Sequence, residues 1–154
     1  MNEKQPLTLR FAPADPHGQQ PELPAYQTAG AAARDVRAWL PQGELTLAPG
    51  QRALVPTGMK IAVPEGWAAL LLARSGLAAK SGIALANGVG LIDSDYRGEL
   101  KVAVINLSSE GFTLRHGDRV AQLMLIPAPH FSVTWEESLD ETARGEGGFG
   151  STRI

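Results

Sequence analysis

Residues 44–73 read ELTLAPGQRALVPTGMKIAVPEGWAALLLA, and this stretch predicts the fold class. Short apolar segments (ELTL, RALVP, GMKIAVP and WAALLLA) follow one another here, with Pro and Gly as punctuation between them. Short strands that are separated by turn residues are typical of a barrel or a sandwich. We therefore expect an all-β domain.

The end of this stretch disagrees with that pattern. Residues 67–80 are rich in Ala and Leu, and intrinsic propensity alone would make them helical. Ser75 and Gly76 interrupt the run. The better interpretation is a buried strand that ends at Arg74, followed by a short helix that Ser75 would cap.

A second stretch, Asn87–Leu100, reads NGVGLIDSDYRGEL and concentrates polar groups. Alternating apolar residues followed by a polar turn between glycines predict a β-hairpin, with Asp93, Asp95 and Tyr96 at or near its tip. A rigid tip with a carboxylate and an aromatic ring is suited to a reactive site. Asp, Ser and Gly are also ordinary residues of a surface turn, so both interpretations stay open on these residues alone.

The composition limits the possible functions. The 154 residues, 44% apolar and 19% charged, indicate one globular domain. The absence of Cys excludes disulfides and Cys-ligated zinc, and it suits a reducing cytoplasm. A formal net charge of −2 provides no general attraction for nucleic acid. The longest apolar run, residues 67–73, is far shorter than the ~20 residues that cross a bilayer, so we expect a cytoplasmic protein without a membrane partner.

Two polar residues elsewhere have open roles. Asp35 lies between small residues and a strand-like segment, where it is either a turn or cap residue or a functional acid. Gln122 is the lone amide in an apolar run, so it is either a core side chain bonded to backbone or a ligand contact.

The end of the chain changes character after FSVTW (residues 131–135), which is the last strand candidate. Residues 136–154 are charged and then rich in glycine, and they end in RGEGGFGSTRI. Such a tail is either a disordered terminus or a mobile lid. As a lid, it would bring one aromatic residue, Phe149, and two arginines, Arg144 and Arg153, over a base and a polyphosphate.

Several motifs, in this order and spacing, resemble those of one family, the homotrimeric deoxyuridine triphosphate nucleotidohydrolases (dUTPases). They are AGAAARDVRA from Ala29, RSGLAAKSG from Arg74, NGVGLIDSDYRG from Asn87, GDRVAQL from Gly117 and RGEGGFGST from Arg144. The resemblance covers nearly the whole chain, and GLIDSDYRG together with a terminal RGEGGFG is highly specific.

The resemblance implies an architecture and a reaction. The fold would be an all-β, distorted jelly-roll or β-clip barrel with one short helix (residues 1–135), followed by a flexible C-terminal arm or lid (residues 136–154). Three copies would form a homotrimer with shared active sites. The reaction would be hydrolysis of dUTP to dUMP and pyrophosphate, by attack of water on the α-phosphorus with Mg²⁺ as cofactor. Such an enzyme keeps uracil out of DNA and supplies dUMP for thymidylate synthesis.

The resemblance also implies roles for individual residues. Asp93 would be the general base, with Asp35 and Gln122 as further catalytic residues. No residue would bind the metal directly, although Asp35 would act on it through water or would orient Arg119. The substrate-binding residues would be Arg74, Ser75, Gly76, Asn87, Gly90, Leu91, Ile92, Tyr96, Lys101, Arg144, Phe149 and Gly150.

These residues would divide between three subunits and between the parts of the nucleotide. The hairpin of one subunit would hold the uracil through Asn87 to Gly90, and its Tyr96 would lie under the sugar. Arg74, Ser75 and Gln122 of a second subunit would bind the phosphates. The tail of a third would place Arg144 on the γ-phosphate and Phe149 on the uracil.

The same residues leave two alternative functions. A dCTP deaminase, or a bifunctional deaminase and dUTPase of the same fold, needs a Glu base in the third motif, where this chain has Asp93, Ser94, Asp95 and Tyr96. A trimeric binding protein without activity would have no need of the complete residue set.

Overall fold

The computed structural model of the protein describes residues 7–148. The elements within this range are β1 (Arg10–Pro13), β2 (Arg34–Arg37), β3 (Glu44–Leu47), β4 (Arg52–Ala62), β5 (Trp67–Leu72), α1 (Ser75–Ser81), β6 (Ile83–Leu85), β7 (Gly90–Ile92), β8 (Glu99–Asn106), β9 (Phe112–Arg115) and β10 (Arg119–Pro127). One sheet has the order β1-β4-β8-β6, another has the order β2-β10-β5-β7, and β3 pairs with β9. The prediction of an all-β fold with one short helix is confirmed, and the sheets stay open instead of closing into one barrel.

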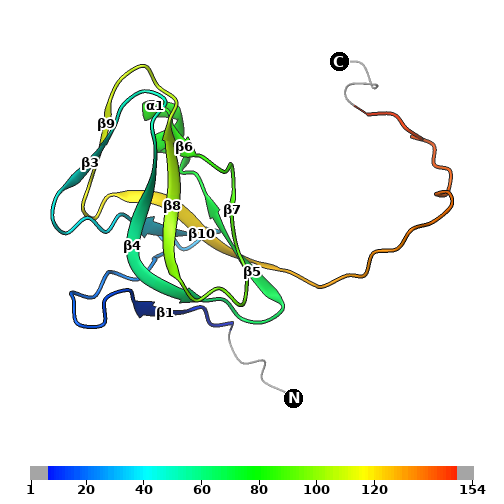
Figure 1. Cartoon of the computed structure of the whole chain (residues 1–154), viewed down its shortest axis with the longest axis horizontal. Helices are drawn as coiled ribbons and strands as arrows, with labels where there is room; N and C mark the ends of the chain where they lie inside the picture. Colours follow the sequence, from blue (N-terminus) through cyan, green and yellow to red (C-terminus); the bar gives the residue numbers. More distant parts are fainter. Residues whose placement is uncertain (1–6, 149–154) are drawn as a thin grey trace.

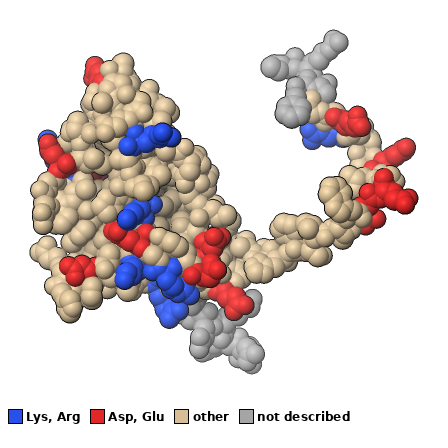
Figure 2. Space-filling model, viewed as in Figure 1, with Lys and Arg blue, Asp and Glu red and all other residues tan. Residues whose placement is uncertain are grey.

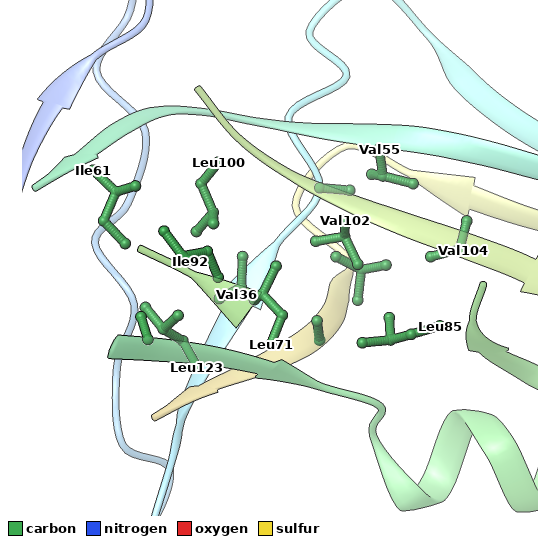
Figure 3. Close-up of a cluster of buried hydrophobic side chains, with 14 of the residues drawn as sticks. Val36, Val55, Ile61, Leu71, Leu85, Ile92, Leu100, Val102, Val104 and Leu123 are labelled. Atoms are coloured by element: carbon green, nitrogen blue, oxygen red, sulfur yellow. The ribbon is translucent and has the colours of Figure 1, made fainter. Parts of the chain in front are cut away.

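The core lies between the two four-stranded sheets (Figure 1). Along β8 the burial alternates, because every second side chain of a strand points to the same face of its sheet. Figure 3 shows apolar side chains from both sheets meeting in the interior; they include Val55, Leu100, Val102 and Val104 from one sheet, and Val36, Leu71, Ile92 and Leu123 from the other. This packing holds the two sheets at a fixed distance.

A bulge in β4 sets the geometry beside the candidate site. The pairing of β4 with β8 shifts register between Pro56 and Lys60. Gly58 occupies the bulge with a φ of 70°, and a Cβ there would lie 2.7 Å from the Trp39 ring. The Gly58 N–H donates to Oε1 of Glu99 (2.9 Å), and the Thr57 hydroxyl donates to the carbonyl of Leu100 (2.6 Å). The bulge thereby fixes the start of β8.

Asn106 closes the other end of β8. It is fully buried, and its Nδ2 donates to the carbonyls of Leu47 (2.9 Å) and Glu110 (2.7 Å). Its Oδ1 accepts hydrogen bonds from the backbone N–H (2.9 Å) and the hydroxyl (2.8 Å) of Ser108. A buried amide with every group paired ties β3, β8 and the turn before β9 together.

The predicted hairpin over residues 87–100 is wrong. β7 pairs with β5 in one sheet, whereas β8 pairs with β4 and β6 in the other. Residues 93–98 therefore cross from one sheet to the other instead of reversing a single pair of strands. The crossing starts with a turn in which the Tyr96 N–H donates to the carbonyl of Asp93 (3.3 Å).

The strand and helix predicted over residues 67–80 are both present, but the predicted cap is wrong. Ser75 is the first residue of α1, and the N-cap is Arg74, which makes no side-chain capping hydrogen bond. The helix ends at Gly82, whose φ of 65° allows its N–H to donate to the carbonyl of Ala78 (3.1 Å). Within the described part of the chain, no helix has the length and apolarity that a membrane span requires.

The tail leaves the sheets after β10 and extends away from them (Figure 1). The strand predicted at residues 131–135 is absent from the described structure. Phe131 (85% exposed), Val133 (84%) and Trp135 (101%) alternate along this segment without any apolar cover in the single chain. Alternating apolar residues that pack on nothing are typical of a segment that docks on another molecule.

Candidate active site

The residues predicted to bind a nucleotide fall into two separate pockets. The first, called here the Asp93 pocket, has a volume of about 330 Å³ and lies between the strands around β7 and β8. The predicted residues that line it are Asn87, Gly90, Leu91, Ile92, Asp93, Tyr96 and Lys101. Its other lining residues are mostly apolar, which suits a base and a sugar.

The backbone before β7 shapes one wall of the Asp93 pocket. Gly88 has a φ of 71°, and its N–H donates to the carbonyl of Leu85 (3.0 Å), so the chain turns tightly toward Asn87 and Gly90. Gly90 is buried, and a Cβ there would lie only 3.0 Å from Cβ of Leu71. Glycine at this position therefore lets the pocket wall lie directly on β5.

Leu91 and Ile92 face in opposite directions on β7. Leu91 is 62% exposed, whereas Ile92 is only 8% exposed and belongs to the hydrophobic core. Ile92 can therefore offer a ligand little more than its backbone and one edge of its side chain. Leu91 presents its whole side chain at the rim of the pocket.

The crossing between the sheets carries the polar groups of this pocket. Asp93 is exposed, and its carboxylate has no hydrogen-bond or ion-pair partner within residues 7–148. Tyr96 is 43% exposed, and its hydroxyl donates to the carbonyl of Glu99 (2.8 Å). An unpaired carboxylate beside a fixed aromatic ring is available to a water molecule or to a ligand.

The second pocket, called here the Arg74 pocket, has a volume of about 190 Å³. The predicted residues that line it are Asp35, Arg74, Ser75, Gly76 and Gln122. Strand pairing explains why they meet, because Gln122 on β10 lies opposite both Asp35 on β2 and Leu72 on β5. Arg74 and Ser75 follow directly after β5.

Asp35 anchors the cations of the Arg74 pocket. Its side chain is 5% exposed, and its Oδ2 lies 3.0 Å from Nη1 of Arg119. Its Oδ1 lies 3.9 Å from Nε of Arg74, whose Nη1 also donates to the carbonyl of Arg119 (2.7 Å). Because one carboxylate faces two guanidinium groups, a positive charge is left over, which favours an anionic ligand.

The two pockets share no lining residue. The third predicted group lies elsewhere again: Arg144 is exposed on the tail, where its Nε donates to the carbonyl of Gly147 (2.7 Å). Phe149 and Gly150 lie outside the described residues. One chain thus carries the predicted base and sugar contacts apart from the predicted phosphate contacts.

Sequence reasoning missed several residues of these pockets, among them one polar residue of the Arg74 pocket. Gln27 lines the Arg74 pocket, and its Oε1 accepts a hydrogen bond from Nη1 of Arg119 (3.1 Å). Glu99 and Leu54 line the Asp93 pocket. Gln27 lies in an irregular loop and Leu54 in an ordinary strand pattern, so neither carries a local signal, whereas Glu99 lies within the stretch that held the other candidates.

The face of the molecule drawn in Figure 2 carries side chains of both charges. Lys and Arg side chains are interspersed with Asp and Glu on this face, and acidic side chains follow one another along the tail. The two cations that line the Arg74 pocket, Arg74 and Arg119, both lie close to Asp35.

Few side chains are available to a metal ion within residues 7–148. Residues 7–148 contain no group of three or more His, Asp or Glu side chains that could hold one. Asp35 keeps acceptor capacity beside its arginine contacts, since a carboxylate offers about four lone-pair sites. This donor set fits Mg²⁺, which commonly binds through phosphate oxygens and water with few protein ligands.

The comparison with protein families agrees with these residues. The dUTPase family model matches residues 19–153 of the chain. The chain belongs to the dUTPase family. A curated dUTPase relative, the deoxyuridine 5'-triphosphate nucleotidohydrolase of Roseobacter denitrificans, is 49% identical over 146 residues, which cover 95% of this chain and 96% of the relative. The protein of the same name from Caulobacter vibrioides is 45% identical over 149 residues and covers 96% of both chains.

Solved dUTPase structures share the fold. The dUTPase of Staphylococcus bacteriophage 80alpha with dUPNHPP superimposes with a TM-score of 0.81 at 23% identity, over 96% of this chain and 99% of that one. A mutant dUTPase from phage phi11 of S. aureus, reported with the coordination of a structural Mg(II) ion, gives a TM-score of 0.72 at 21% identity, over 87% of this chain and 99% of that one. The predicted jelly-roll-like fold of the dUTPase family is thereby confirmed.

Proposed function

We propose that this member of the dUTPase family hydrolyses dUTP to dUMP and pyrophosphate by attack of water on the α-phosphorus. One observation carries the proposal: an apolar pocket presents an unpaired carboxylate, Asp93, while a separate pocket gathers guanidinium groups around Asp35. A nucleoside triphosphate needs both environments. Its base and sugar need apolar walls, and its phosphates need cations.

The Asp93 pocket holds the deoxyuridine. The backbone and side chain around Asn87 and Gly90 hydrogen-bond the edge of the uracil, and Tyr96 lies under the sugar, where it excludes a ribose 2′-hydroxyl. A site built on such bonds rejects cytosine, because the wrong edge would leave buried polar groups unpaired. Leu91 and Ile92 supply apolar contacts, and Lys101 contributes a cation at the rim.

Asp93 acts as the general base. It accepts a hydrogen bond from the attacking water and takes a proton from it as the oxygen approaches the α-phosphorus. The bond between the α-phosphorus and the bridging oxygen breaks, and pyrophosphate leaves. The exposure of Asp93 and its lack of a partner within residues 7–148 support this role, since the carboxylate is free to accept from water.

The Arg74 pocket holds the phosphates. Arg74, Ser75, the backbone at Gly76 and the Gln122 amide donate hydrogen bonds to phosphate oxygens. Asp35 positions Arg74 and Arg119, and it would act on Mg²⁺ through water. When bound, Mg²⁺ would neutralise negative charge on the triphosphate.

A complete site requires more than one copy of the chain, so the protein works as a homotrimer. The separation of the two pockets within one chain supports this arrangement, since a heterologous interface repeated around a threefold axis brings the Asp93 pocket of one copy to the Arg74 pocket of the next. Residues 1–135 form the β domain, and residues 136–154 form a lid from a third copy. The lid places Arg144 on the γ-phosphate, with Phe149 and Gly150 over the uracil.

This reaction keeps uracil out of DNA and supplies dUMP for thymidylate synthesis, so we expect the enzyme to act in the cytoplasm. The absence of Cys from the sequence suits that compartment. The alternative is a dCTP deaminase, or a bifunctional enzyme of the same fold. It is less favoured because the third motif offers Asp93 where a Glu base would be needed.

Pyrophosphate release from dUTP, dTTP, dCTP and UTP tests the proposal. We expect kcat/KM for dUTP to exceed that for each of the other nucleotides by about 10²-fold or more, because hydrogen-bonded recognition discriminates strongly. Ammonia release from dCTP would establish the deaminase alternative. The absence of pyrophosphate release from every nucleotide, with Mg²⁺ present, would show that the chain is not a hydrolase.

A further inference from the structure

We propose that Gly98 is a positioning residue, whose missing side chain makes room for the Tyr96 ring and thereby sets the selectivity for deoxyribose over ribose. The inference rests on the proposed function, because it takes the sugar to lie against Tyr96. It concerns a residue two positions beyond the ring, within the crossing between the two sheets.

The space beside Gly98 is filled by the tyrosine ring. A Cβ at this position would lie 2.6 Å from Cζ and 2.9 Å from Cε2 of Tyr96, and still closer to its hydroxyl oxygen. These separations are shorter than any real Cβ contact. The ring therefore occupies the volume that any side chain at residue 98 would need.

Backbone conformation does not explain the glycine. Gly98 is not among the described glycines with a positive φ, so its φ does not call for glycine. Gly88, in the turn before β7, has a φ of 71° and is needed for its turn. At Gly98 the requirement is space alone, and the neighbour that requires the space is Tyr96.

The ring is held in place from the other side. The Tyr96 hydroxyl donates to the carbonyl of Glu99 (2.8 Å), which is the first residue of β8. The Glu99 side chain in turn accepts from the N–H of Gly58 in the β4 bulge (2.9 Å). The ring thus folds back over Gly98 onto a strand end that the bulge fixes. A methyl group at residue 98 would force it off this carbonyl.

The displaced ring can go toward solvent, because Tyr96 is already 43% exposed and its atoms lie at the end of a side chain. We therefore expect Gly98→Ala to fold and to bind phosphates, but to lose control over the sugar. The measurement is the ratio of kcat/KM for dUTP to kcat/KM for UTP. We expect this ratio to fall by about tenfold or more in Gly98→Ala, because the ring that rejects the 2′-hydroxyl has moved.

A double-mutant cycle with Tyr96→Ala isolates the contact. Without the ring, Gly98→Ala has nothing to displace, so it should change the ratio by less than about twofold in that background. The matched control is Gly43→Ala, since nothing lies within 4 Å of a Cβ there and its φ is not in the left-handed region. The ratio of this control should stay within about twofold of the parent.

The outcomes separate this inference from the proposed function. A parent enzyme that hydrolyses UTP as well as dUTP would overturn the role of Tyr96 itself. A selective parent whose ratio survives Gly98→Ala would overturn only the inference about Gly98. Should Gly98→Ala fail to fold, the Gly98→Ala/Tyr96→Ala variant should recover the fold, and an unfolded double variant would show that Tyr96 is not the neighbour in conflict.

Discussion

Two inactive variants should restore activity to each other when they assemble into the same trimer. Asp93→Asn removes the proposed base from the Asp93 pocket, and Arg74→Ala removes a proposed phosphate contact from the Arg74 pocket. Because the two pockets share no residue, a site built from two neighbouring copies can draw an intact pocket from each variant. Neither variant alone can form such a site.

The expected recovery of activity follows from the fraction of active sites that are competent in mixed trimers. A site is competent only when one copy supplies an intact Asp93 pocket and its neighbour supplies an intact Arg74 pocket. In random trimers from equal amounts of the two variants, about one quarter of all sites meet this condition, and every mixed trimer has roughly one competent site in three. Activity should therefore return to about one quarter of the parent value.

The assay is pyrophosphate release by the variants after co-refolding, with two different affinity tags to show that mixed oligomers have formed. The control pair is Asp93→Asn with Asn87→Ala, since both changes lie in the Asp93 pocket and no arrangement restores an intact one. Recovery by the first pair alone supports the shared site. Mixed oligomers of the first pair that remain inactive would refute the sharing of sites between copies.

The remaining predictions concern single positions. Asp93→Asn should lower kcat by about 10²–10⁴-fold, because the general base is lost, while calorimetry still detects binding of a non-hydrolysable dUTP analogue. Truncation before Arg144 should lower kcat/KM by about 10²-fold or more, because the lid is lost, yet leave the circular dichroism spectrum and the oligomeric state unchanged. Asn106→Ala should lower the free energy of unfolding in urea by about 2–4 kcal/mol, because the buried carbonyl of Leu47 and the carbonyl of Glu110 lose their donor.

Each of these three predictions would be contradicted by a specific result. Hydrolysis at the parent rate by Asp93→Asn would remove Asp93 from the role of base, and full activity of the truncated chain would remove the lid. For Asn106 the matched control is Thr46→Val, which breaks only the exposed hydroxyl contact with Thr113 (2.8 Å). Equal decreases in the free energy of unfolding for Asn106→Ala and Thr46→Val would show that burial of the Asn106 amide does not determine the loss of stability.

Much of the fold could be predicted from the sequence, because the residues that start and end its strands are neighbours along the chain. Pro and Gly between short apolar segments predicted strands, and β3, β4 and β5 lie where those segments do. The interruption at Ser75 predicted where α1 begins. Pro56 and Gly58 did not separate two strands, however, because the bulge in β4 accommodates them within one strand. The capping role assigned to Ser75 was wrong, since the side-chain geometry of a cap depends on the approaching loop.

The sequence by itself also determined the family and a set of candidate residues, because the motifs are contiguous and carry their own chemistry. Their grouping into two pockets was decided only by the tertiary structure. Gln122 meets Asp35 through the pairing of β10 with β2, which joins residues 87 positions apart, and Gln27 joins them from a loop without any pattern. Spacing along a chain does not encode which distant strands pair.

The stretch from Asn87 to Leu100 also combines features that the sequence predicts with features that only the tertiary structure decides. The sequence predicts that an acid, a tyrosine and tight turns lie together in this stretch, and the structure contains them there. Only the three-dimensional packing decided that β7 and β8 belong to different sheets, because strands are assigned by the apolar faces that meet across the core and not by adjacency in sequence. Tyr96 and Gly98 both lie within that crossing, and the Tyr96 ring fills the space beside Gly98.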